Sequence, residues 1–164
     1  MKRLVLMLML VMSIVSFSWD KISYRTREGS YVEQPMIMMN TVTSEGIETA
    51  PVAITVREVY EDNNCVFQIN DLQQYEVYGD VEVAFTFGIF EETVALMMKG
   101  KGDWITVSSK DSTESARDVF RLIQLMKTEP KCSMVIKTGN GMIHTAEVDL
   151  MGFTKAYNNM YHRR

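Results

Sequence analysis

Residue types that commonly build active sites and metal sites are scarce in this sequence. Only two cysteines, two histidines and three prolines occur among 164 residues. The sequence has no Gly-x-x-x-x-Gly-Lys-Ser/Thr loop, no Gly-x-Gly-x-x-Gly turn, no His-Glu-x-x-His helix and no Gly-x-Ser-x-Gly elbow. Phosphate-loop, dinucleotide, zinc-protease and serine-hydrolase chemistry are therefore disfavoured.

The few possible acid–base groups do not form a catalytic pattern. His162 stands among the last three residues, where chains are least ordered, so an imidazole mechanism would depend on His144. Adjacent carboxylates are the other source of such groups, but Glu61-Asp62 and Glu91-Glu92 fall in turn-like segments. We expect these carboxylates to be solvated, and we predict no catalytic residue.

An excess of positive charge is also absent. The chain has 17 basic and 21 acidic residues, which gives a net charge of −4. Because an acidic protein repels phosphate groups, we expect neither nucleic acid nor an anionic lipid surface as a partner.

One long hydrophobic run is present, and it lies at the N-terminus. Lys2 and Arg3 precede an almost unbroken apolar stretch over residues 4–15, and small residues lie three and one positions before Trp19. This pattern is typical of a secretory signal peptide. The run is shorter than the about 20 residues that cross a bilayer. We therefore predict cleavage near Ser18/Trp19 and a single periplasmic or secreted domain over residues 19–164, with no stable membrane span.

Both cysteines lie in the part of the chain that we predict to be exported. Cys65 and Cys132 belong to no Cys-x-x-Cys pair and have no histidine nearby in sequence, so redox and metal patterns are missing. Export favours oxidation, and a disulfide closing so long a loop stabilises a fold by about 4 kcal/mol in the chain-entropy account. We expect a structural Cys65–Cys132 disulfide, with a reactive thiol or a metal thiolate as the alternatives.

Hydrophobic alternation with a period of two residues runs through much of the chain. It is clearest over residues 81–89, where the residues of one parity are Val81, Val83, Phe85, Phe87 and Ile89. Residues 94–99 and 104–109 flank a glycine-rich tip that suits a four-residue hairpin loop. We predict a mostly β, α+β fold, built as an antiparallel sheet or a two-layer β-sandwich of seven to nine strands.

One main helix is expected over residues 113–127, immediately before the last hairpin. Asp111 or Ser112 can cap its N-terminus. Its apolar stripe at helical spacing consists of Ala116, Val119, Phe120, Ile123 and Met126. A short C-terminal helix is expected over residues 152–161.

The register of the last hairpin can be predicted from burial. A three-residue loop over residues 139–141, with a left-handed glycine, sets apolar side chains opposite one another: Met134 with Ala146, Cys132 with Val148, and Ile136 with His144. A two-residue loop would set apolar residues opposite polar ones. We therefore predict the three-residue loop and a semi-buried core histidine at position 144.

Methionine leaves a metal site open as an alternative. Thioethers bind Cu(I), and the predicted register places Met134, Met142 and His144 on neighbouring rows of one sheet face. Methionine also fills irregular gaps in ordinary cores. We expect no cofactor, with copper as the alternative.

The C-terminal part of the chain resembles a known family. Trp19 at the predicted cut, the helix leading into Cys132, the glycine-turned hairpin and the closing segment over residues 148–156 are similar to small periplasmic proteins of the invasion-associated locus B type. The resemblance implies an exported, β-rich domain without an assigned enzymatic site.

Binding residues are most reasonably sought among aromatic side chains in loops. The candidates are Tyr75, Tyr78 and Trp104, which ends the glycine-rich tip. We predict a non-enzymatic interaction module of the cell envelope that binds another envelope or extracellular protein. The alternatives are a Cu(I)-binding protein and an enzyme whose site is dispersed in the sequence.

Overall fold

The computed structural model of the protein describes residues 19–25, 31–39, 41–43, 46, 51–59, 64–70, 77–138, 141 and 143–159. The predicted signal peptide, Tyr75, Met142 and His162 lie outside these residues. The strands are β1 (Asp20–Arg25), β2 (Tyr31–Met39), β3 (Val42–Thr43), β4 (Val52–Val59), β5 (Asn64–Asn70), β6 (Val77–Phe87), β7 (Glu92–Gly102), β8 (Ile105–Ser108), β9 (Lys131–Lys137) and β10 (Ile143–Asp149). The helices are α2 (Thr113–Thr128) and α3 (Phe153–Asn159).

The described strands form one antiparallel sheet. Its ten strands follow the order β1-β2-β4-β5-β8-β7-β6-β9-β10-β3, and every pairing is antiparallel. The predicted mostly β, α+β class is confirmed, with a single curled sheet as its architecture. Among the described residues, neither helix has the length and apolar composition that a transmembrane segment requires.

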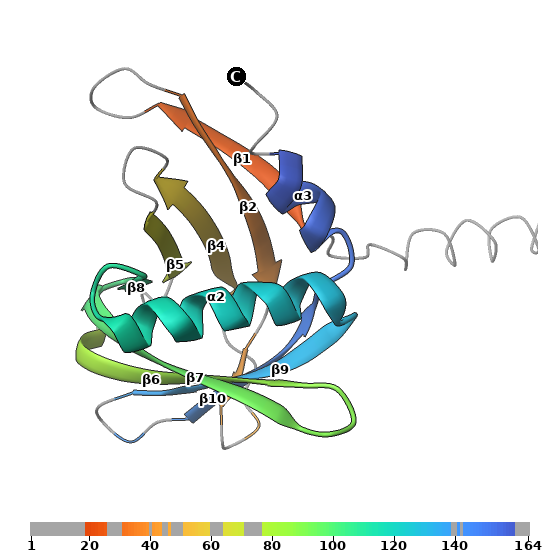
Figure 1. The fold of residues 1–164 in the computed structure, drawn as a ribbon. Helices are drawn as coiled ribbons and strands as arrows, with labels where there is room; N and C mark the ends of the chain where they lie inside the picture. The colour runs from red at the N-terminus through yellow and green to blue at the C-terminus, as the bar shows by residue number, and fades with distance from the viewer. Residues whose placement is uncertain are drawn as a thin grey trace, which may run out of the picture.

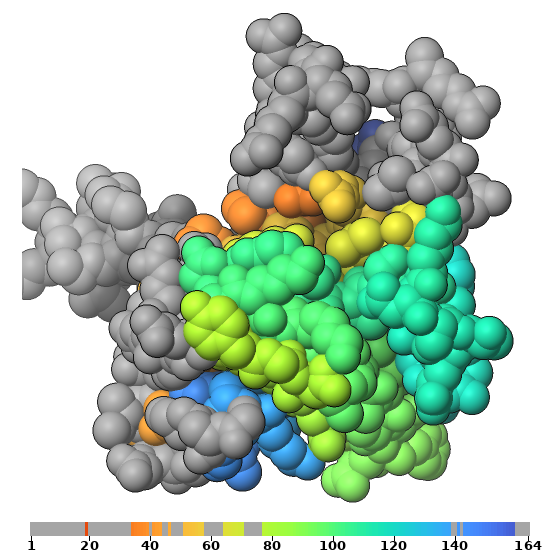
Figure 2. All heavy atoms as spheres, turned by 90° about the vertical axis from the view of Figure 1, so that its left-hand side faces the viewer, coloured from red at the N-terminus to blue at the C-terminus, as the bar shows by residue number. Residues whose placement is uncertain are grey.

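The sheet curls so strongly that its two ends approach each other. Met39 in β2 pairs with Val52 in β4, whereas Val42, three residues later, pairs with Thr145 in β10. β2 and β3 thus lie near opposite ends of the strand order although they nearly adjoin in sequence. Figure 2 shows the same result, because orange atoms lie both beside the yellow strands and beside the blue ones.

Side chains meet across the interior of this curl. The rings of Phe67 in β5 and Phe85 in β6 are 5.4 Å apart, edge to face, although β8 and β7 separate these strands in the sheet. Helix α2 lies across the open, concave side (Figure 1). The apolar sides of the sheet and of α2 therefore share one core, in which Ile54, Met98, Leu122 and Met126 are fully buried.

Trp19 connects the first strand to the far end of the sheet. Its indole N–H donates to the backbone carbonyl of Asp149 at 2.9 Å, and its ring lies 4.7 Å from that of Phe153 in α3. Trp19 is buried, and so are Phe153, Ala156 and Tyr157 on the inner side of α3. The predicted C-terminal helix therefore exists, and it packs where β1 and β10 come together.

The predicted register of the β9–β10 hairpin is confirmed. Its cross-strand pairs include Ile136 with His144, Met134 with Ala146, and Cys132 with Val148. Gly141 has a φ of 83°, and its N–H donates to the carbonyl of Thr138 at 2.9 Å. Burial alternates along both strands, as expected for a sheet with one solvated face.

The prediction that Ile89 continues the buried row of β6 is wrong. β6 ends at Phe87, which pairs with Glu92, and residues 88–91 form the turn into β7. Gly88 and Glu91 adopt left-handed φ values of 62° and 52°, so the alternation of a strand stops there. Ile89 therefore points into solvent and not into the core.

Helix α2 begins and ends almost where the sequence predicts, but its buried face is rotated. Ser112 caps it by accepting the N–H of Ser115 at 2.9 Å. Leu122 is fully buried, whereas Phe120, which we expected in the core, is 46% exposed. The physical reason is that the curl admits only the stripe of Val119, Leu122, Ile123 and Met126.

This rotation predicts a contrast between two substitutions. Leu122→Ala removes a fully buried side chain and should lower the free energy of unfolding by about 2–5 kcal/mol. Phe120→Ala should lower it by less than about 1 kcal/mol, because the ring is half exposed. Urea denaturation of both variants checks this, and a larger loss for Phe120→Ala would contradict the observed packing.

Candidate functional site

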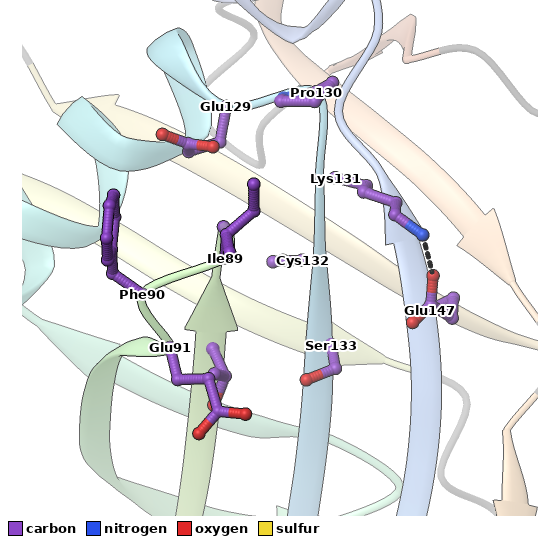
Figure 3. A pocket seen from close by; sticks show the side chains of 11 residues that line it. Ile89, Phe90, Glu91, Glu129, Pro130, Lys131, Cys132, Ser133 and Glu147 are labelled. Carbon is purple, nitrogen blue, oxygen red and sulfur yellow. Dashed lines mark hydrogen bonds and ion pairs between the residues drawn. The ribbon is translucent and has the colours of Figure 1, made fainter.

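A pocket lies where strand pairing stops. β6 and β9 pair as far as Phe87 with Cys132, and β6 then turns away while β9 extends one residue further to Lys131. The gap between the 88–91 turn and the start of β9 has a volume of about 670 Å³. Its lining consists of Thr86, Gly88, Ile89, Phe90, Glu91, Glu129, Pro130, Lys131, Cys132, Ser133 and Glu147 (Figure 3).

The turn beside this pocket carries two large apolar side chains that the fold does not cover. Ile89 is 96% exposed and Phe90 is 97% exposed. Scattered apolar residues on a surface are ordinary, but two adjacent ones with almost complete exposure, beside a pocket, make this turn a candidate contact surface. We call Gly88, Ile89, Phe90 and Glu91 the apolar turn.

Carboxylates surround the pocket. Glu147 forms an ion pair with Lys131 at 3.1 Å, and both side chains are solvated. Glu129 lies close to the apolar turn, since a Cβ placed on Gly88 would be 3.5 Å from its Oε2. In Figure 3, Glu129 and Glu91 lie on opposite sides of Ile89. Because Lys131 and Glu147 offset each other, the charge around the pocket is −2.

The aromatic residues predicted from the sequence lie at the other end of the same hairpin. Tyr78 is 70% exposed and pairs with Lys101, whose amide donates to the carbonyl of Trp104 at 2.9 Å. The structure thus brings Tyr78 and Trp104 together, while Tyr75 lies outside the described residues.

The rings of Trp104 and Tyr78 both have contacts within the protein. The ammonium of Lys101 lies 5.1 Å from the centroid of the Trp104 ring, a cation–π contact. The Tyr78 hydroxyl would be 3.6 Å from a Cβ on Gly102, so this ring leans over a cross-strand glycine. Binding by Tyr78 and Trp104 stays a prediction, and the apolar turn is the more available surface.

His144 occupies the core position that the hairpin register predicts. It pairs with Ile136 in β9 and with Thr43 in β3, and it is buried. Burial lowers the pKa of its imidazole below the ordinary 6.5. The expected core histidine is therefore buried more completely than predicted, and it is held neutral.

The copper alternative gains no surface site. Met134 and His144 are both buried, on neighbouring rows of the inward face, and Met142 lies outside the described residues. Within the part of the chain that the structure describes, no three His, Cys, Asp or Glu side chains come together as metal ligands. A Met134/Met142/His144 site stays a prediction.

A second, smaller pocket of about 380 Å³ lies between α2 and the β6–β7 hairpin. Its carboxylates already have basic partners within the fold. Glu82 pairs with Lys137 at 2.7 Å, and Asp118 pairs with Arg117 at 2.9 Å. This pocket therefore offers less unsatisfied charge than the pocket beside the apolar turn.

The predicted disulfide is wrong. Cys65 in β5 and Cys132 in β9 are both buried, and no bond joins them. The strands β8, β7 and β6 lie between β5 and β9 in the sheet, which the loop length alone could not reveal. Burial, followed by the charge of Glu147, raises the pKa of the Cys132 thiol to about 12. Its thiol is therefore protonated at neutral pH and is a poor nucleophile.

Comparison with protein-family models, with curated proteins and with solved structures found no match for this chain. The resemblance to proteins of the invasion-associated locus B type stays a prediction. The function is therefore inferred from the geometry of the surface.

The apolar turn was not predicted from the sequence, because Ile89 continues the alternation of apolar residues in β6. One signal was available, since Gly88 precedes Ile89-Phe90 and two glutamates follow. A glycine and a glutamate pair around two large apolar residues indicate a turn better than a buried strand end.

The cysteines provide a chemical test of the corrected fold. We expect a maleimide reagent to label neither thiol of the folded protein and both thiols in denaturant without reductant, because both are buried and no disulfide joins them. Intact-mass spectrometry counts the labels. Two unlabelled cysteines in denaturant, labelled only after reduction, would show a disulfide and contradict the structure.

Buried His144 predicts a pH dependence of stability. In the unfolded chain the imidazole of His144 is protonated near pH 6.5, whereas in the folded chain it is protonated only at lower pH. The free energy of unfolding should therefore fall as pH decreases through 6.5, and less steeply for His144→Gln. Urea melts between pH 8 and pH 5 measure both slopes, and equal slopes would show that His144 does not contribute.

Proposed function

We propose that this chain is a non-enzymatic interaction module that acts in the periplasm or outside the cell and binds another envelope or extracellular protein. The observation that carries this proposal is the apolar turn, where Ile89 and Phe90 are almost completely exposed beside a 670 Å³ pocket. Burial of apolar surface is the dominant favourable term in most protein–protein association.

The position of the turn suits this role. It closes the β6–β7 hairpin, whose two strands pair over their full length of 11 residues. Thr86 and Thr93 share a hydroxyl contact of 3.0 Å beside the turn, and Arg121 of α2 pairs with Glu92 at 2.8 Å. These contacts hold the base of the turn, so little conformational entropy is lost when a partner binds.

The chemistry of the buried residues supports a binding role over catalysis. Cys132 and His144 could in principle act as nucleophile and base, but both are buried, and burial keeps the Cys132 thiol protonated. Glu147, which lines the pocket, has Lys131 as a solvated partner. The residues at the pocket provide apolar surface and charged groups, which suit the binding of another protein.

The proposal predicts that the apolar turn retains a partner. Full-length protein with a C-terminal tag, expressed in its native host and purified through the tag, should retain a bound protein from the envelope fraction. An Ile89→Ser/Phe90→Ser variant should retain it at least about tenfold less, because two anchors typically contribute more than 1.4 kcal/mol together. Quantitative mass spectrometry measures the retained amounts.

The matched control removes exposed apolar side chains elsewhere on the same hairpin. Tyr78→Ser/Met97→Ser should retain the partner as the unaltered chain does, and thermal melts should show that both variants fold. Equal retention by all three proteins would contradict the proposal. Loss only in the Tyr78→Ser/Met97→Ser variant would contradict the proposal and place the interface on the part of the hairpin that carries Tyr78 and Met97.

A further inference from the structure

Two carboxylates, one in the apolar turn and one beside it, differ from the other acidic residues of this surface. On the surrounding strands, Asp80 pairs with Lys99, Glu82 with Lys137, Glu92 with Arg121, and Glu147 with Lys131. Among the described residues, Glu91 and Glu129 have no basic partner. These two side chains lie on opposite sides of Ile89 (Figure 3).

From this arrangement we infer that the partner presents an extended segment with an apolar side chain between two arginines or lysines. The inference rests on the proposed function, because it names the chemistry of the partner that binds the apolar turn. The apolar side chain would pack against Ile89 and Phe90, and the two cationic side chains would pair with Glu91 and Glu129.

Charge complementarity favours this occupant over a second copy of the chain. A two-fold dimer through this surface would bring together two sets of Glu91 and Glu129, four carboxylates with no intramolecular basic partner among the described residues. Like charges at an interface oppose association. The excess of acidic residues likewise disfavours an anionic membrane surface.

The spacing of the partner follows from strand geometry. Side chains on one face of an extended segment alternate with a period of two residues. An Arg-Ser-Leu-Ser-Arg segment therefore places both guanidinium groups and the leucine on the same face. Arginine suits the site because its planar guanidinium can bind a carboxylate with two hydrogen bonds.

The test is a titration of isotope-labelled full-length protein with the peptide acetyl-Gly-Arg-Ser-Leu-Ser-Arg-Gly-amide, followed by amide chemical shifts in NMR spectra. We expect shifts at residues 88–91 and 129–133 and weaker binding at higher salt. Glu91→Gln and Glu129→Gln should each raise Kd by about two- to fivefold, the range for solvated ion pairs. A peptide with glutamate in place of both arginines should bind more weakly than either variant binds the arginine peptide.

The control variants Asp103→Asn and Glu114→Gln each remove one negative charge away from the pocket, as Glu91→Gln and Glu129→Gln do beside it, and each should bind the arginine peptide as the unaltered protein does. Equal loss of binding in these controls would show a general charge effect and overturn the inference.

The remaining outcomes separate this inference from the proposed function. Two results would show that the partner is not basic and would overturn the inference alone. In the first, both peptides bind equally. In the second, neither peptide shifts the amide signals of the pocket residues, while the Ile89→Ser/Phe90→Ser variant still loses the envelope partner. Shifts at the apolar turn that depend on protein concentration alone would identify a second copy as the occupant. Loss of the amide signals of the apolar turn on adding phosphatidylcholine vesicles would identify a membrane as the occupant. Either result would overturn the inference.

Discussion

The closure of the sheet is the constraint on which the rest of the structure depends. Two connections make it: the short step from Met39 in β2 to Val42 in β3, and the hydrogen bond from the Trp19 indole to the Asp149 carbonyl. Both join one end of the strand order to the other. With the ends held together, the inward rows of the sheet face one another across a narrow space, and α2 covers its open side. An open sheet of the same strands would leave one apolar face without a partner.

Closure also explains why the pocket and the apolar turn lie where they do. A curled sheet directs its hairpin turns to the ends of the curl, where the neighbouring strand gives no further cover. β9 starts at Lys131, directly after the end of α2, so it cannot extend far enough to pair with residues 88–91. The backbone therefore turns at Gly88 with a left-handed conformation, and Ile89 and Phe90 emerge from the sheet. The same geometry that completes the core leaves this apolar area exposed.

Sequence patterns predicted those parts of the fold in which two independent requirements coincide. The β9–β10 register was predictable because the loop and the burial of both strands favour the same alignment, as the pairing of Met134 with Ala146 shows. Helix α2 was predictable in extent but not in rotation, since neighbouring stripes containing Phe120 or Leu122 are nearly equally apolar and the concave sheet selects one of them. The alternation of apolar residues wrongly predicted that Ile89 is buried, because alternation does not show where a strand ends. The disulfide was expected from export and cysteine spacing, whereas Cys65 and Cys132 are not joined and lie on strands that β8, β7 and β6 separate in the sheet. The pocket beside the apolar turn was missed because it arises where β6 and β9 end at different places.

Closure of the sheet is the central claim, and it can be measured directly in solution. Nuclear Overhauser effects between backbone protons of Val42 and Thr145 report the β3–β10 pairing, and those between Met39 and Val52 report the β2–β4 pairing. We predict that one sample shows both sets, together with ring contacts between Phe67 and Phe85. A spectrum with the Met39–Val52 contacts but without the Val42–Thr145 contacts would describe an open sheet and contradict this account.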